Sequence, residues 1–193
     1  GVLPEGALAR WVTLLEDAGY VVQRGRHSAS VDPEAPYLAG CDEDRAAALQ
    51  AAFTDPDVDG IVCARGGYGC MRLLRHLDPD SFLPRPLVGF SDVTALHGFL
   101  ATQVGLASLH GPLLSTLQVH EAGALSSMLR ALSGGVPQPL VMDTICEGEA
   151  EGRLIGGNLT LVGSLLGTGY FPPLEGAIVF LEEIGESPYR IDR

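Results

Sequence analysis

The sequence predicts an α/β protein built on a doubly wound, mostly parallel sheet. Two observations lead to this fold class. Short apolar runs of strand length, such as 60–64 and 86–90, alternate along the chain with segments that carry apolar residues at helical spacing. A run that is apolar at every position indicates a strand covered on both faces, as in a parallel sheet with helices on either side.

The elements of residues 1–132 follow from apolar spacing and from the residues that begin or end helices. Leu8, Trp11 and Leu15 lie at helical spacing, and Gly19 ends that helix. Asp42 and the two acidic residues after it begin a second helix, because the amino end of a helix favours negative charge. The expected order is helix 5–18, strand 20–22, loop 28–41, helix 42–53, strand 60–64, a helix to residue 77, strand 86–90, helix 91–101, strand 106–110 and helix 121–132.

Residues 133–139 are expected to divide the chain, because SGGVPQP holds two glycines and two prolines, the composition of a linker. We therefore predict a first domain over 1–132 and the beginning of a second over 140–193. The elements expected in this second part are strands at 140–142 and 152–155, a helix at 159–166 and a strand at 177–182.

Composition excludes several classes of function. The 193 residues are 46% apolar, which is typical of a globular chain, and no apolar run approaches the ~18 residues of a membrane helix. The net charge is −12 and every basic residue is arginine, so we expect no nucleic-acid partner. The lack of a long apolar run leads us to expect no membrane partner. Walker-type and Schiff-base chemistry are excluded because both need lysine.

The cysteines and histidines argue against a metal site. The four cysteines lack CxxC spacing, and there is no HxH or HExxH spacing, so we expect no metal. Cys63 and Cys70 read as buried free thiols of a reducing compartment. No secretory signal is visible, and a cytoplasmic location is expected, although the start at Gly1 leaves processing open.

Ser91 is the first candidate for chemistry. It follows strand 86–90 and begins a helix at once, which is the position of a nucleophile elbow, and the N–H of Asp92 would then face a developing oxyanion. The elbow consensus is half met, since Val93 stands where the elbow has a glycine. A simple helix N-cap is the alternative role for Ser91.

The turn at residues 64–69, ARGGYG, also lies between a strand and a helix. Backbone N–H groups of Gly66 and Gly67 could cradle a phosphate or complete an oxyanion hole. The turn is not GxGxxG, so a dinucleotide fingerprint is unsupported, and a tight turn without a ligand is the alternative. Both turns follow parallel strands and should lie at the same sheet edge.

A serine nucleophile needs a base and an orienting carboxylate. His97 lies six residues along the helix from Ser91, about 9 Å, too far for direct contact. His110 ends a strand and could share the edge, or it could only fix the Gly-Pro turn that follows. Glu182 and Glu183 close strand 177–182 and cannot face the same side; one could orient an imidazole. The other histidines, expected in surface or loop positions, are His27, His76 and His120.

Several motifs in register resemble the LD-carboxypeptidase family of serine peptidases, which includes the microcin C immunity peptidases. They are ARGGYG (64–69), GFSD (89–92), HGP (110–112), GGN (156–158), and LEE (181–183) running on to PYRIDR (188–193). The resemblance implies a flavodoxin-like domain joined to a β-rich C-terminal domain, with the active site between them. It also implies a homodimer without cofactors that cuts the bond to a C-terminal D-amino acid in murein peptides.

The resemblance assigns roles residue by residue within a Ser-His-Glu triad. Ser91 would be the nucleophile and Glu182 the triad carboxylate, with oxyanion donors from Asp92 and from Gly66 or Gly67. Arg65 and Tyr68 would bind substrate; the fork of Arg65 suits a terminal carboxylate, or it could pair with an acidic neighbour.

The resemblance also predicts that this chain is an incomplete copy. The family histidine lies well downstream of the Leu-Glu motif, and no histidine here matches it; the family's first strand is also missing. The 193-residue chain alone is therefore expected to be inactive. The alternatives are a hydrolase of peptidyl nucleotides and a non-catalytic module that binds anions or peptides.

Overall fold

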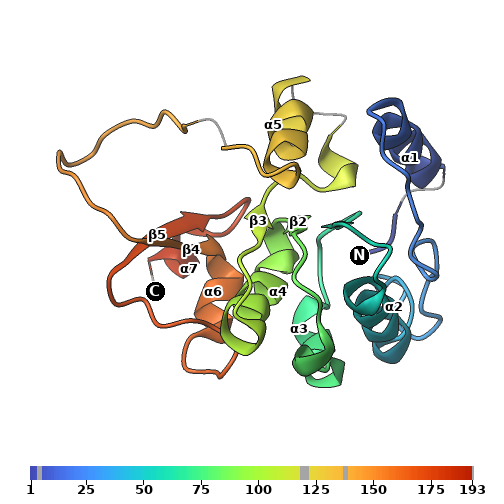
Figure 1. The fold of residues 1–193 in the computed structure, drawn as a ribbon. Helices are drawn as coiled ribbons and strands as arrows, with labels where there is room; N and C mark the ends of the chain where they lie inside the picture. The colour runs from blue at the N-terminus through green and yellow to red at the C-terminus, as the bar shows by residue number, and fades with distance from the viewer. Residues whose placement is uncertain (4–5, 118–121, 137–138, 193) are drawn as a thin grey trace.

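The computed structural model describes residues 1–193 apart from 4–5, 118–121, 137–138 and 193. Figure 1 shows a parallel sheet with helices on both sides and a second sheet near the carboxyl-terminal end. The first sheet joins β1 (Ile61–Val62), β2 (Leu87–Gly89) and β3 (Leu109–His110) in that order, and the second pairs β4 (Arg153–Asn158) with β5 (Ala177–Glu182), also in parallel. The helices are α1 (Ala7–Asp17), α2 (Asp42–Thr54), α3 (Cys70–Leu73), α4 (Thr94–Phe99), α5 (Ala122–Leu132), α6 (Leu159–Leu165) and α7 (Pro188–Ile191).

The two faces of the first sheet carry separate cores, as the doubly wound fold requires. Leu87 and Val88 are adjacent in β2 and both are fully buried, so their side chains point to opposite faces. Leu87 packs in the core that includes Phe53 of α2, whereas Val88 packs with Trp11 of α1 and Met128 of α5. In Figure 1, α1 and α5 accordingly lie on one side of the sheet and α2, α3 and α4 on the other. The predicted fold class is confirmed.

The strands predicted at 20–22 and 140–142 are wrong. Both segments lie outside the strands of the described residues, and Val21 and Val141 are 95% and 98% exposed. Apolar and β-branched residues form a strand only where a neighbouring strand pairs with them, and neither segment pairs with a strand among the described residues. Residues 139–152 instead form a long exposed connection. Residues 137–138 of the predicted linker, which come just before it, lie outside the described residues.

The second sheet packs directly against the start of α4. The backbone N–H of Asn158 donates to Oγ1 of Thr94 at 2.9 Å. Gly157 has φ +136°, and a Cβ there would lie 2.4 Å from the same hydroxyl oxygen, so only glycine allows this approach. The carboxyl ends of β4 and β5 therefore reach the helix that follows Ser91.

Candidate active site

Ser91 has the backbone conformation of a nucleophile elbow. Its φ is +63°, and among the described residues it is the single non-glycine residue with positive φ. β2 ends two residues earlier, Phe90 is extended, and residues 91–93 turn into α4. A left-handed serine costs about 1–3 kcal/mol of strain, which persists where the surrounding structure holds it. The N-cap alternative is wrong, because Phe90 occupies the cap position and no side-chain cap bond forms there.

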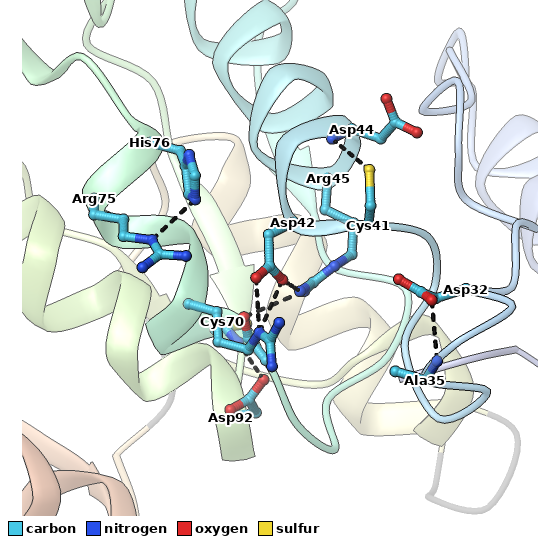
Figure 2. Close-up of polar contacts among 12 residues, drawn as sticks. Asp32, Ala35, Cys41, Asp42, Asp44, Arg45, Cys70, Arg75, His76 and Asp92 are labelled. Carbon is cyan, nitrogen blue, oxygen red and sulfur yellow. Dashed lines mark hydrogen bonds and ion pairs between the residues drawn. The ribbon is translucent and has the colours of Figure 1, made fainter.

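The glycine turn lies against Ser91, as expected. A Cβ on Gly66 would lie 3.0 Å from Cβ and 3.1 Å from Oγ of Ser91. The buried side chain of Asp92 connects the two turns. Asp92 is 4% exposed, and its Oδ2 accepts the N–H of Cys70, the residue after the glycine turn, at 2.8 Å (Figure 2). The start of α3 and the start of the Ser91 helix are thereby held together, with Gly67 in the same turn at φ +104°.

Arg65 and Tyr68 lie at the exposed side of this turn. Arg65 donates to the backbone carbonyl of Val2 and forms no ion pair within the described part of the chain. Tyr68 is 55% exposed, and its ring packs edge-on against Tyr37 at 5.9 Å between centroids. Sequence reasoning missed Tyr37, because it comes from an irregular loop without a periodic signal.

Glu182 and Glu183 lie in different surroundings. Oε1 of Glu182 is buried and has no hydrogen-bond partner among the described residues. Burial raises the pKa of Glu182 and the charge of Glu183 adds to the effect, while the Ser91 N–H and the Asn158 side chain act in the opposite direction. Glu182 is thus a carboxylate beside the Ser91 backbone with an oxygen left for another donor.

Glu183 is fully engaged at the start of α6. Its carboxylate accepts the hydroxyl of Thr160 at 2.7 Å, the N–H of Thr160 at 3.2 Å and the amide of Asn158 at 3.1 Å. The Thr160 hydroxyl is the largest influence that lowers the pKa of Glu183. This residue stabilises the junction of β4 and α6 and has little capacity left for chemistry.

No described histidine forms a hydrogen bond with Ser91. Nε2 of His97 lies 2.9 Å from the carbonyl oxygen of Gly89 and Nδ1 lies 2.7 Å from Oγ of Ser108, so His97 supports the strand before Ser91. His110 is exposed and its ring packs edge-on against Phe180. His27 lies 3.9 Å from Asp44, and His76 accepts from Arg75 (Figure 2). His120 lies outside the described residues.

The stability of the protein is expected to fall as the pH drops from 6.5 toward 4. Burial lowers the pKa of His97 to about 4, and the nearby His110 adds to this. Because the unfolded chain binds the proton at higher pH than the folded one, acid favours unfolding over this window, by roughly 3 kcal/mol for His97. Urea unfolding at several pH values should show a flatter profile for His97→Gln. His76→Gln, on an exposed histidine, is the matched control, and equal profiles for His97→Gln and the parent would contradict the assignment.

Among the described residues, Cys63 and Cys70 offer no second nucleophile, and no cluster of side chains offers a metal site. Burial raises the pKa of Cys63 to about 12 and places that of Cys70 well above its ordinary value, so neither thiol is a ready nucleophile. All four cysteines are free. Within the described ranges, no group of three or more His, Cys, Asp or Glu side chains could hold a metal ion. None of the helices in these ranges has both the length and the apolar character of a membrane span.

The fold and this geometry define an α/β protein with a strained serine at the carboxyl edge of a parallel sheet, the arrangement of nucleophile-elbow hydrolases. Residues 2–111 match the LD-carboxypeptidase N-terminal domain, and residues 151–193 match the LD-carboxypeptidase C-terminal domain. The chain belongs to the LD-carboxypeptidase family, as the motifs predicted.

Individual relatives agree with this family. The murein tetrapeptide carboxypeptidase of Pseudomonas aeruginosa is 38% identical over 198 residues, which cover 93% of this chain and 62% of that protein. The crystal structure of muramoyltetrapeptide carboxypeptidase from Oxalobacter formigenes superposes with a TM-score of 0.82 at 31% identity, covering all of this chain and 66% of that one. An MccF-like protein from Bacillus anthracis gives 0.79 at 27% identity, covering 94% of this chain and 63% of that one. The chain spans 53–62% of the length of three curated relatives that it matches.

Proposed function

We propose that the whole protein is a serine carboxypeptidase that cleaves the L–D amide bond to a C-terminal D-amino acid in murein peptides. The observation that carries the proposal is Ser91, held at φ +63° against Gly66, with the carboxylate of Glu182 beside it. Membership of the LD-carboxypeptidase family and the name of the Pseudomonas relative support the substrate class.

In the proposed mechanism, Ser91 Oγ attacks the carbonyl carbon that precedes the terminal D-residue. The N–H of Asp92 and one from Gly66 or Gly67 stabilise the tetrahedral oxyanion. A histidine takes the serine proton and gives it to the leaving amine, which departs as the D-amino acid. Water then attacks the acyl-enzyme, and the histidine passes a proton from that water to Ser91 Oγ as the acyl product leaves. Glu182 orients that histidine, which we propose comes from the part of the protein that follows Glu182.

The remaining assignments are part of the same proposal. Arg65 and Tyr68 would contact the substrate, with the guanidinium pairing its terminal carboxylate. The family matches at 2–111 and 151–193 support a nucleophile domain at 1–132, a linker at 133–139 and the start of the C-terminal domain at 140–193. The free thiols support a cytoplasmic location. Dimerisation is proposed from the family resemblance alone.

The test is release of D-alanine from a murein tetrapeptide by the full-length protein. We expect release of D-alanine from the natural peptide and no release of L-alanine from the same peptide ending in L-alanine. Absence of D-alanine release would contradict the proposal. If a peptidyl nucleotide were cleaved instead, the result would favour the second candidate function, which the likeness to the MccF-like protein supports. Tetrapeptide binding without any cleavage would favour a binding module.

A further inference from the structure

A charge cluster centred on the buried Asp42 lies beside the glycine turn, and the proposed mechanism does not use it. Asp42 and Arg45 belong to α2, and Arg72 belongs to α3, which follows the turn. Asp42 is 6% exposed; its two carboxylate oxygens accept Nε of Arg72 at 3.0 and 2.8 Å, and it pairs with Nη2 of Arg45 (Figure 2). Burial alone would raise the pKa of Asp42, but the hydrogen bonds from the two arginines outweigh it and lower that pKa.

Arg45 extends from this cluster to the last glycine of the turn. Its Nη1 donates to the carbonyl oxygen of Gly69 at 3.2 Å. A Cβ on Gly69 would lie 2.9 Å from Nη1 and 3.0 Å from Nη2, so the guanidinium packs directly on the glycine. Gly69 also has φ +114°, a conformation that larger residues rarely adopt.

The same peptide unit is held from its other end by Asp92. The unit consists of the carbonyl of Gly69 and the N–H of Cys70. Arg45 binds the carbonyl at 3.2 Å, and Oδ2 of Asp92 accepts the N–H at 2.8 Å. Two hydrogen bonds from charged groups therefore fix the plane of this peptide, and such bonds are stronger than those between neutral groups.

This peptide unit connects both proposed oxyanion donors. Three residues before it, Gly66 touches Ser91, and Asp92 itself carries the other donor N–H. A change in the plane of the Gly69–Cys70 peptide would move the Gly66 and Gly67 N–H groups relative to Ser91. Displacements of about 1 Å at a reacting centre can cost about 100-fold in rate.

We propose that Arg45 is a positioning residue: anchored by Asp42, it orients the Gly69–Cys70 peptide so that the glycine turn presents its N–H groups to the oxyanion. This inference rests on the proposed function. The role is indirect, since Arg45 touches the turn and not Ser91. Replacing Arg45 should therefore weaken the stabilisation of the transition state, in which the oxyanion exists. It should have little effect on the binding of uncleaved peptide.

The test compares Arg45→Lys with Arg75→Lys in the full-length protein. Lysine keeps a positive charge beside Asp42 but lacks the fork that also reaches Gly69. Arg75 is the matched control, because it is exposed and, within the described part of the chain, its Nε donates only to the neighbouring His76. For Arg45→Lys we expect kcat to fall about 10- to 100-fold with KM within about twofold, and faster hydrogen exchange at the Cys70 amide. Arg75→Lys should change neither measurement.

Each outcome decides the inference. An unchanged kcat in Arg45→Lys would overturn the positioning role, whether or not hydrogen exchange at Cys70 becomes faster. A variant whose kcat/KM falls only because KM rises would overturn it as well. If Arg45→Lys fails to fold, Asp42→Asn, which leaves Arg45 in place but removes the charge that anchors it, is measured in the same way. A parent protein without D-alanine release would overturn the proposed function instead. In that case hydrogen exchange still tests the inference: an unchanged exchange rate of the Cys70 amide in Arg45→Lys would overturn the link between Arg45 and the turn.

Discussion

Replacing Ser91 with alanine in the full-length protein is expected to lower kcat for D-alanine release by about 10⁴- to 10⁶-fold. The change removes the proposed nucleophilic oxygen and nothing else from the edge of the sheet. Alanine and serine bear the same strain at φ +63°, and no cap bond depends on the Ser91 hydroxyl, so the backbone should stay in place. The measurement is the steady-state rate of D-alanine release from murein tetrapeptide.

The control for this prediction is Ser126→Ala. Ser126 is exposed on α5, and its hydroxyl donates to the carbonyl of Gly123 at 3.0 Å, so its loss should leave kcat unchanged. Thermal unfolding of Ser91→Ala should match that of the parent, and the variant should still bind tetrapeptide by calorimetry. A Ser91→Ala protein with kcat within tenfold of the parent would show that another group performs the attack.

The position of Ser91 could be predicted because it depends on local order along the chain. A buried parallel strand followed at once by a helix places the intervening residue at the carboxyl edge, whatever the rest of the fold does. The glycine turn at 64–69 follows the same rule from the neighbouring strand. The contact between Gly66 and Ser91 is therefore a consequence of two strand-to-helix turns that lie side by side in one sheet.

The features that could not be predicted depend on contacts between distant segments. Arg45 and Gly69 are 24 residues apart, and no periodic pattern joins them. The segment at 140–142 has the composition of a strand, but its state depends on whether another strand lies alongside it. The difference between Glu182 and Glu183 also belongs here. The alternation of side chains along a strand places Glu182 and Glu183 on opposite sides. Only the packing of β4 and α6 shows that it is Glu183 whose carboxylate accepts hydrogen bonds from Asn158 and Thr160.

If Glu182 is the triad carboxylate as proposed, Glu182→Gln is expected to lower kcat by about 10⁴-fold, because an amide would neither hold the proposed histidine in the useful tautomer nor stabilise its charged form. Glutamine keeps the size of the side chain, so the packing of β5 on β4 should survive. Burial raises the pKa of Glu182, so the carboxylate is lost at a higher pH than for an ordinary glutamate, and the acid side of the pH-rate profile should reflect this. The measurement is kcat against pH for the parent and the variant.

Glu183→Gln is the matched control, since it makes the same chemical change one residue later. Its carboxylate supports Thr160 and Asn158 at the start of α6, so the change should reduce the free energy of unfolding by about 1–3 kcal/mol while kcat of the folded protein stays close to that of the parent. The two variants thus separate catalysis from support of the fold. If Glu183→Gln lost the activity and Glu182→Gln retained it, the triad carboxylate would be Glu183, and the unpartnered oxygen of Glu182 would need another explanation.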